Sequence, residues 1–181
     1  MKGISVKLSC GLVFCVVMLL AANAFSRDYM YILKFDKGEM FSDFDAQKVS
    51  LSLSKEHGKD GKVCMKIEFK TNSSVGEWNP SRKMWSDYSK VAFHIFSEDT
   101  EERDLKFRVK GAAQPVNDPK NTFDTVLKIK PGDGDYTVDL SNAVCNDKES
   151  KLDTKSIYLY AFTNSSEKPL TIYLSDFKLM K

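Results

Sequence analysis

The side chains that could perform covalent catalysis are few and scattered along the sequence. The chain holds 2 His and 4 Cys in 181 residues. A Ser-His-Asp site would rest on His94 alone, because the other histidine, His57, lies in a glycine-containing turn. Glu101 and Glu102 are adjacent in a charge-rich stretch, which is typical of a solvated loop. The motifs G-x-S-x-G and H-E-x-x-H and the phosphate-binding glycine loops are absent from the sequence. We therefore expect a protein that is not an enzyme.

The first 24 residues have the three parts of a secretory signal peptide. Lys2 and Lys7 make a positive start, residues 8–22 form an apolar run, and an Ala-x-Ala cleavage signal ends at Ala24. The alternative is an uncleaved membrane anchor, because residues 8–26 carry no charge. No later stretch is long and apolar enough to span a bilayer. We expect cleavage after Ala24, a secreted or periplasmic protein, and no membrane attachment of the cleaved chain.

The net charge argues against a nucleic-acid ligand. The whole chain has 27 Lys+Arg and 25 Asp+Glu, which gives a formal charge of +2. Removing the signal peptide takes away Lys2 and Lys7, so that the remaining charges balance. Nucleic-acid binders need an excess of cations over the phosphate backbone. A neutral protein therefore fits an uncharged ligand better than DNA or RNA.

Two cysteines remain after the predicted cleavage, Cys64 and Cys145. An exported protein meets an oxidising compartment, in which disulfides form and persist. A bridge between them would close a loop of about 80 residues, worth roughly 4 kcal/mol in the chain-entropy model. Sequence separation alone does not bring two cysteines within bonding distance. A disulfide and two free thiols therefore both stay open.

Strict alternation of apolar and polar residues runs through most of the remaining chain. In one segment, Leu105, Phe107 and Val109 oppose Lys106 and Arg108. Such a period of two predicts a strand that buries one face. The nine segments of this kind or of high strand propensity are residues 29–35, 48–54, 63–70, 90–96, 105–110, 123–129, 136–140, 156–162 and 170–180.

The connections between these segments are rich in Gly, Pro, Asn and Asp, which are turn residues. No segment keeps a helical period of 3.6 residues. About nine short strands with one buried face each must pair as two sheets or close into a barrel. We predict one all-β domain over residues 25–181, a two-sheet antiparallel β-sandwich of jelly-roll type.

Three parts of the chain resemble carbohydrate-binding modules with a galactose-binding-like jelly roll. Residues 49–69, VSLSLSKEHGKDGKVCMKIEF, resemble the second and third strands of those modules. Residues 85–93, WSDYSKVAF, are similar to the W-S-x-Y-x-x-L-x-F start of the next strand. Residues 171–179, TIYLSDFKL, are similar to the closing L-Y-L-D-D-I-R-L strand. The resemblance covers nearly all of the chain after the signal peptide and implies the same fold.

The resemblance also implies a structural Ca²⁺ site, although no cofactor is required. Asp36 and Glu39 follow the first strand, and Asp176 lies in the closing motif, where many such modules hold calcium. Calcium takes several oxygen ligands, which carboxylates and backbone carbonyls at a loop supply. Ser175 stands where the family often has a further Asp, and Lys37 lies between the two acids. A solvated acidic turn is the alternative.

The second site that the resemblance implies is a glycan-binding face. Sugars lay their C–H faces on aromatic rings, while polar side chains bind the hydroxyls. The candidates are Trp78, in a loop between Gly76 and Pro80, and residues opposite the predicted core: His94, Arg108, Tyr158 and Tyr160. If their strands were neighbours in one sheet, these side chains would share one polar and aromatic surface.

Together these features predict an exported, non-catalytic binding module whose partner is a glycan or polysaccharide. Fold alone does not fix function, so two alternatives stay open. One is a structural or adhesive sandwich that contacts a protein partner at the cell surface or in the periplasm. The other, which we favour less, is a jelly-roll enzyme acting on polysaccharide through scattered carboxylates.

Overall fold

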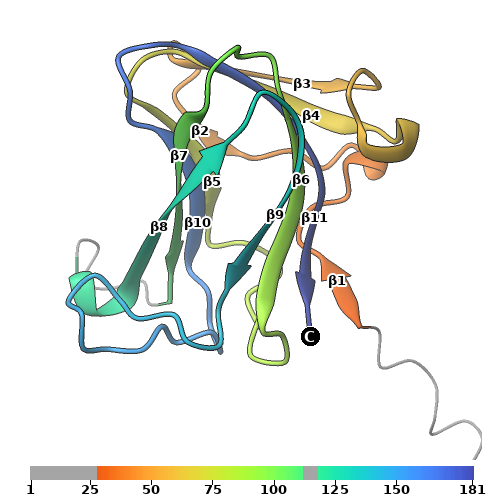
Figure 1. The fold of residues 1–181 in the computed structure, drawn as a ribbon. Coiled ribbons are helices and arrows are strands. Elements are labelled where there is room, and N and C mark those ends of the chain that lie inside the picture. Colours follow the sequence, from red (N-terminus) through yellow and green to blue (C-terminus); the bar gives the residue numbers. More distant parts are fainter. Residues whose placement is uncertain (1–27, 112–117) are drawn as a thin grey trace, which may run out of the picture.

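The chain folds into two antiparallel sheets that pack face to face (Figure 1). This computed structural model describes residues 28–111 and 118–181. The predicted signal peptide therefore lies outside the described residues. Within the described ranges, no helix has the length and hydrophobicity that a membrane crossing needs.

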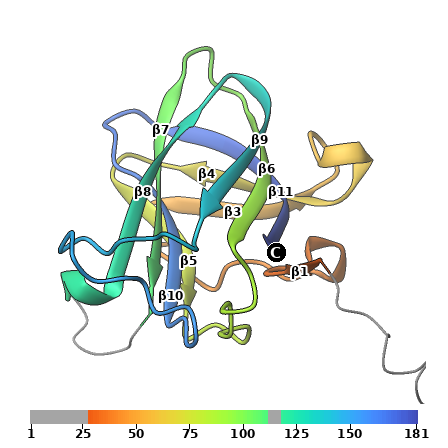
Figure 2. The ribbon, with the colours of Figure 1, turned by 60° about the horizontal axis from the view of Figure 1, so that its bottom comes forward.

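The first sheet contains six strands in the order β3-β4-β11-β6-β9, with β1 pairing beside β11. The second sheet contains five strands in the order β2-β5-β10-β7-β8. Figures 1 and 2 show β7, β8 and β10 in one layer and β6, β9 and β11 in the other. The strands of the first sheet are β1 (Tyr29–Tyr31), β3 (Val49–Ser54), β4 (Cys64–Phe69), β6 (Lys90–Ser97), β9 (Gly132–Asp139) and β11 (Leu170–Met180). Those of the second are β2 (Asp43–Phe44), β5 (Ser73–Trp78), β7 (Arg103–Lys110), β8 (Thr122–Ile129) and β10 (Leu159–Asn164).

The predicted β-sandwich is confirmed, and its strands number eleven in the described residues instead of about nine. The two that alternation missed are β2 and β5. β2 has only two residues, and β5 reads SSVGEW, which resembles a loop because glycine and serine are poor strand formers. The described connections contain three short 3-10 helices, Phe35–Lys37, Lys59–Gly61 and Pro119–Asn121.

Aromatic rings from both sheets fill the space between them. The centroids of Phe107 and Phe162 are 4.9 Å apart, and those of Phe93 and Phe162 are 5.4 Å apart. All three side chains are buried. The alternating positions Leu105, Phe107 and Val109 of β7 face this core, so their neighbours Lys106 and Arg108 face outward.

The connection between β3 and β4, residues 55–63, folds back over the outer face of the first sheet (Figure 1). The ring of His57 stacks on Phe96, with centroids 3.6 Å apart and an angle of 6° between the planes. The Lys59 ammonium donates to Asp135 at 2.6 Å, and its backbone N–H donates to the Ser175 hydroxyl. These contacts hold the connection on the sheet, so that it covers part of the outer face.

Candidate functional site

The outer face of the second sheet carries a groove of about 430 Å³. Its floor comes from β5, β10 and β7, and the short strand β2 contributes one wall. The residues that line it are Ser42, Asp43, Phe44, Ser74, Gly76, Trp78, Arg108, Leu159, Ala161 and Thr163. The groove thus lies on a regular sheet, which holds its side chains in fixed positions.

Small side chains make the floor of the groove. Gly76 pairs with Ala161 across β5 and β10, and Ser74 pairs with Thr163. A Cβ atom on Gly76 would lie 2.8 Å from the Cβ of Ala161 and would overlap the carbonyl oxygen of Tyr160. Only glycine allows the two strands to approach this closely. The result is a shallow surface between taller neighbours, open to a flat ligand.

An exposed tryptophan stands at one end of this floor. The Trp78 side chain is 45% exposed, and its backbone N–H donates to the Asp43 carboxylate. Tyr158 supports the ring edge-to-face, at 5.8 Å between centroids and 89° between planes. The backbone N–H of Asn79 donates to the Tyr158 carbonyl at 2.6 Å, which ties the end of β5 to the chain before β10. The indole is therefore held in place with much of its surface in water.

A bidentate ion pair forms the opposite side of the groove. Arg108 of β7 donates through two nitrogens to the two oxygens of Asp124 on β8, both at 2.7 Å. Burial raises the pKa of Asp124, but the hydrogen bonds and charge of Arg108 outweigh this effect, and the net pKa is lowered. Asp124 in turn raises the pKa of Arg108 by accepting its hydrogen bonds. The pair fixes the guanidinium at the groove while keeping its local net charge near zero.

Trp78 and Arg108, two of the five predicted ligand-binding residues, line this groove. Tyr158 braces Trp78 from the side. Three of the five candidates therefore lie near one another on the second sheet.

The outward orientation predicted for Tyr160 is wrong. Tyr160 is 1% exposed and packs in the core against Phe41, Trp85 and Phe177. Burial raises the pKa of its hydroxyl far above the ordinary value. Both faces of the 156–162 segment are apolar, so alternation did not say which face points inward. The core takes the larger side chains of β10, and the smaller Leu159 and Ala161 face the groove.

His94 does not lie with the other candidates, because β6 belongs to the first sheet. Its ring is buried between two carboxylates of β9: Nδ1 is 3.0 Å from Asp135 and Nε2 is 3.0 Å from Asp133. Asp135 also accepts from Lys59, and these contacts, Lys59 first and His94 second, lower its pKa. The histidine is thus part of the contacts beneath the loop of residues 55–63.

The predicted calcium ligands Asp36, Glu39 and Asp176 lie in the described residues, among which no group of three or more His, Cys, Asp or Glu side chains is placed to hold a metal ion. Glu39 accepts two hydrogen bonds from the Arg82 guanidinium and one from the Lys34 amide, and those of Arg82 are the main cause of its lowered pKa. Asp176 lies 3.6 Å from the ammonium groups of both Lys62 and Lys178. Cations of the chain itself therefore balance the charges of Glu39 and Asp176.

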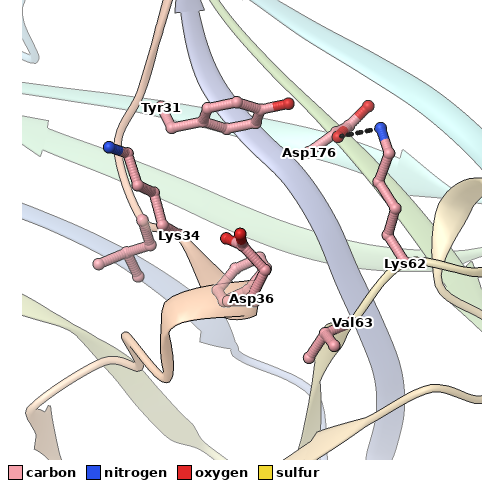
Figure 3. A pocket seen from close by; sticks show the side chains of 8 residues that line it. Tyr31, Lys34, Asp36, Lys62, Val63 and Asp176 are labelled. Atoms are coloured by element: carbon pink, nitrogen blue, oxygen red, sulfur yellow. Dashed lines mark ion pairs between the residues drawn. The ribbon is translucent and has the colours of Figure 1, made fainter.

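Asp36 and Asp176 do line one common pocket of about 360 Å³ (Figure 3). It opens where β11 changes partners, from β4 at residues 170–174 to β1 at residues 178–180. Asp176 sits at this irregularity with a left-handed backbone, φ 52°. Figure 3 shows Tyr31 and Lys62 pointing toward Asp176, while Asp36 lies across the pocket.

Cys64 and Cys145 are free thiols in the structure, so the disulfide between them that the sequence left open is not formed. Cys64 begins β4, and its thiol donates to the carbonyl oxygens of Ser54 and Glu56. Burial raises the pKa of Cys64 to about 11 and also raises that of Cys145. Both thiols are therefore protonated near neutral pH and poorly nucleophilic.

Sequence reasoning missed most of the groove floor and the partner of Arg108. Phe44, Gly76, Ala161 and Asp124 are the main examples. The one available signal was Gly76, because a glycine between residues of a strand often marks a close approach of two backbones. The segment around it was instead interpreted as a loop.

Comparisons with known proteins give the fold. No family model matches the chain, and no curated protein matches it. A family 11 carbohydrate-binding module from Clostridium thermocellum, solved with a beta-1,3-1,4-mixed-linked tetrasaccharide, is 18% identical with a TM-score of 0.58. The match covers 74% of this chain and 82% of that module. The chain has the fold of a carbohydrate-binding module.

Two further structures agree with this fold. A family 30 carbohydrate-binding module of a Clostridium thermocellum cellulosomal cellulase is 16% identical, with a TM-score of 0.52 over 78% of this chain and 90% of that one. An agarase is 16% identical with a TM-score of 0.61, and the match covers 86% of this chain. The chain spans only 25% of the agarase, so the likeness concerns a part of that enzyme.

Proposed function

We propose that this protein is an exported, non-catalytic module that binds a glycan in the groove of the second sheet. The observation that carries the proposal is the rigid, half-exposed Trp78 ring beside a floor of small side chains. A sugar ring can lie on such a floor and place its C–H face against the indole. The carbohydrate-binding-module fold of the chain supports the same ligand class.

The electrostatics of the groove favour an uncharged ligand with many hydroxyls. The Arg108–Asp124 pair neutralises itself, and so does the Lys128–Asp104 pair further along the same sheet. Both pairs still present donors and acceptors to a ligand that approaches from solvent. A neutral sugar can use these groups without breaking either ion pair, and the carboxylate of Asp43 in the groove already accepts hydrogen bonds from the Ser42 hydroxyl and the Trp78 N–H.

The expected affinity is modest. One indole that buries about 100 Å² of sugar contributes roughly 2.5 kcal/mol before the entropy cost of association. A few hydrogen bonds at the groove edge add about 1 kcal/mol each. Dissociation constants in the millimolar to micromolar range follow.

A panel of insoluble and soluble polysaccharides tests the proposal. The wild-type chain should be retained by at least one of them, and Trp78→Ala should reduce the retained fraction at least tenfold. Met84→Ala is the matched control, because Met84 is also an exposed large apolar residue but does not line the groove. If no polysaccharide retains the wild-type chain, or if both variants bind like wild type, glycan binding in this groove is excluded.

Export and the absence of catalysis need their own measurements. Expression with the native start should yield an exported chain beginning at Phe25, which intact mass determines. Incubation with the retained polysaccharide should release no reducing ends. A chain that keeps residues 1–24, or a polysaccharide that is shortened, contradicts the corresponding part of the proposal.

A further inference from the structure

The two edges of the first sheet differ in how they are protected against pairing with another chain. β9, at one edge, carries Asp133, Asp135 and Asp139, and such charges discourage further strand addition. β3, at the other edge, reads VSLSLS. It has six regular residues with no charge, no proline and no bulge in its pairing with β4. β3 therefore lacks the usual devices that block edge-to-edge association.

The backbone of β3 offers free hydrogen-bonding groups along this edge. Just before the strand, the Lys70 N–H donates to the Lys48 carbonyl at 2.8 Å. Hydrogen-bonded pairs recur at every second residue of an antiparallel ladder, so Ser50, Ser52 and Ser54 turn their backbone groups toward β4. Leu51 and Leu53 then turn theirs away, and in the described part of the chain β3 pairs with no other strand.

We infer that β3 pairs antiparallel with β3 of a second copy of this chain, with Ser52 facing Ser52 across a two-fold axis. In this register Leu51 lies opposite Leu53 of the second copy, and the two pairs exchange four backbone hydrogen bonds. A two-fold contact brings the same segment of both copies together, so an edge that carries charges of one sign repels itself. The uncharged sequence of β3 has no such repulsion.

The hydrogen bonds before the strand support the same register. The Val49 N–H donates to the Asp45 carbonyl at 2.8 Å, so this end of β3 is already in use. Beyond Ser54 the chain bends away from the strand at Lys55 and Glu56. Leu51 and Leu53 are therefore the residues that can offer both backbone groups, and Ser52 lies midway between them.

The pairing also covers apolar surface. The Leu53 side chain is 40% exposed at the free edge, and Leu51 is half-buried beside it. Pairing brings these leucines against those of the second copy on the inner side of the continuous sheet. One strand pair buries less than a standard stable interface, so the dimer should form and dissociate with concentration. Dimer formation through β3 does not depend on glycan binding.

Cysteine cross-linking tests the register directly. In Ser52→Cys, the two new thiols face each other in a non-hydrogen-bonded pair, where Cα atoms lie about 4.5 Å apart, within disulfide range. Ser50→Cys is the matched control on the same exposed face. Its two thiols would lie roughly 14 Å apart along the strands, since they are offset by four residues. Mild oxidation should therefore convert Ser52→Cys to a covalent dimer and leave Ser50→Cys monomeric, by non-reducing electrophoresis.

Sedimentation velocity over a concentration series supplies the second measurement. The wild-type chain should shift from monomer to dimer as its concentration rises. Ser52→Lys places two cations face to face on the axis and should raise the dimer dissociation constant at least tenfold. Ser50→Lys faces Ser54 and should change it less than twofold. A wild-type chain that stays monomeric at all concentrations overturns the proposal. So does cross-linking of Ser50→Cys at the rate of Ser52→Cys.

Discussion

The outer faces of the two sheets start from the same alternation of residues but end with opposite exposure. On the first sheet, the loop of residues 55–63 lies over the strands, with His57 stacked on Phe96 and Lys59 bonded to Asp135. On the second sheet, small residues such as Ala161 leave a groove, and Trp78 stands exposed beside it. An outward side chain is therefore available to a ligand only where no connection of the chain covers it.

The largest expected effect concerns two tyrosines of the second sheet, Tyr160 in its core and Tyr158 beside Trp78 on its outer side. Tyr160→Ala removes a fully buried ring and should lower the free energy of unfolding by about 3–5 kcal/mol. Tyr158→Ala, two residues away, removes a half-buried ring and should cost about 1 kcal/mol through its contact with Trp78. Urea denaturation measures both. Equal losses would mean that Tyr160 does not belong to the core.

A large side chain on the groove floor should close the open face of the second sheet. Ala161→Phe adds a ring to the groove floor and should weaken glycan retention at least tenfold, about 1.4 kcal/mol, by occupying the space of the ligand. Val126→Phe is the control, because Val126 is exposed on β8 of the same sheet and does not line the groove. Both variants should melt close to wild type. Undiminished retention by Ala161→Phe would show that the ligand lies elsewhere.

The sequence was sufficient to predict the sandwich and insufficient to predict its open face. Alternation in β7 assigned Phe107 to the core and Arg108 to the surface correctly, because one of its faces is charged. In β10 both faces are apolar. Whether Tyr160 points inward or outward therefore depends on which of the two alternating sets of side chains fills the core better.

The pairing of strands also lay beyond sequence patterns. His94 and Arg108 were both correctly expected on outer faces, yet β6 and β7 belong to different sheets. Which strands become neighbours is decided by long-range contacts that a period of two does not encode. The covering of Phe96 by His57 has the same origin, since the loop returns over a strand far along the chain.

Loosening the loop of residues 55–63 should expose the covered face of the first sheet. His57→Ala removes the ring that stacks on Phe96 and should cost about 1 kcal/mol of stability. The amide of Lys59, which donates to Ser175, should exchange with solvent faster as the loop loosens. His57→Phe should restore the protection, because it keeps the stacked ring. Glycan retention should not change, and a parallel loss of retention would contradict the separation of the two faces.

The fourth prediction compares one carboxylate from each face in acid. The pKa values of Asp124 and Asp135 are both lowered in the folded state, so each contributes stability above its unfolded pKa, about 4. This contribution is lost as the pH falls through the folded pKa. The Asp124 side chain is 20% exposed and that of Asp135 is 67% exposed, so solvent screens Asp135 more.

Asp124→Asn should therefore cost somewhat less than 1 kcal/mol at neutral pH, and Asp135→Asn should cost a few tenths. Both differences from wild type should shrink as the pH falls through the lowered folded pKa of each carboxyl, because the wild-type group then becomes protonated. Urea midpoints measured across this range test the ordering. A larger effect of Asp135→Asn would place the stronger electrostatic contact on the covered face.

The smallest expected effect concerns calcium. Asp176 on the first sheet lies between Lys62 and Lys178, and Glu39 accepts hydrogen bonds from Arg82, so the chain already supplies the positive charges that these carboxylates need. Bound calcium would have to displace ammonium and guanidinium groups that are covalently attached and always present. The melting temperature should therefore be the same with chelator and with added Ca²⁺. Lys62→Ala sharpens the test: it removes one competing cation, so a calcium-dependent rise in melting temperature confined to this variant would identify the lysine as what excludes the ion. A rise in the wild-type chain would instead show that Asp36, Glu39 and Asp176 rearrange to bind it.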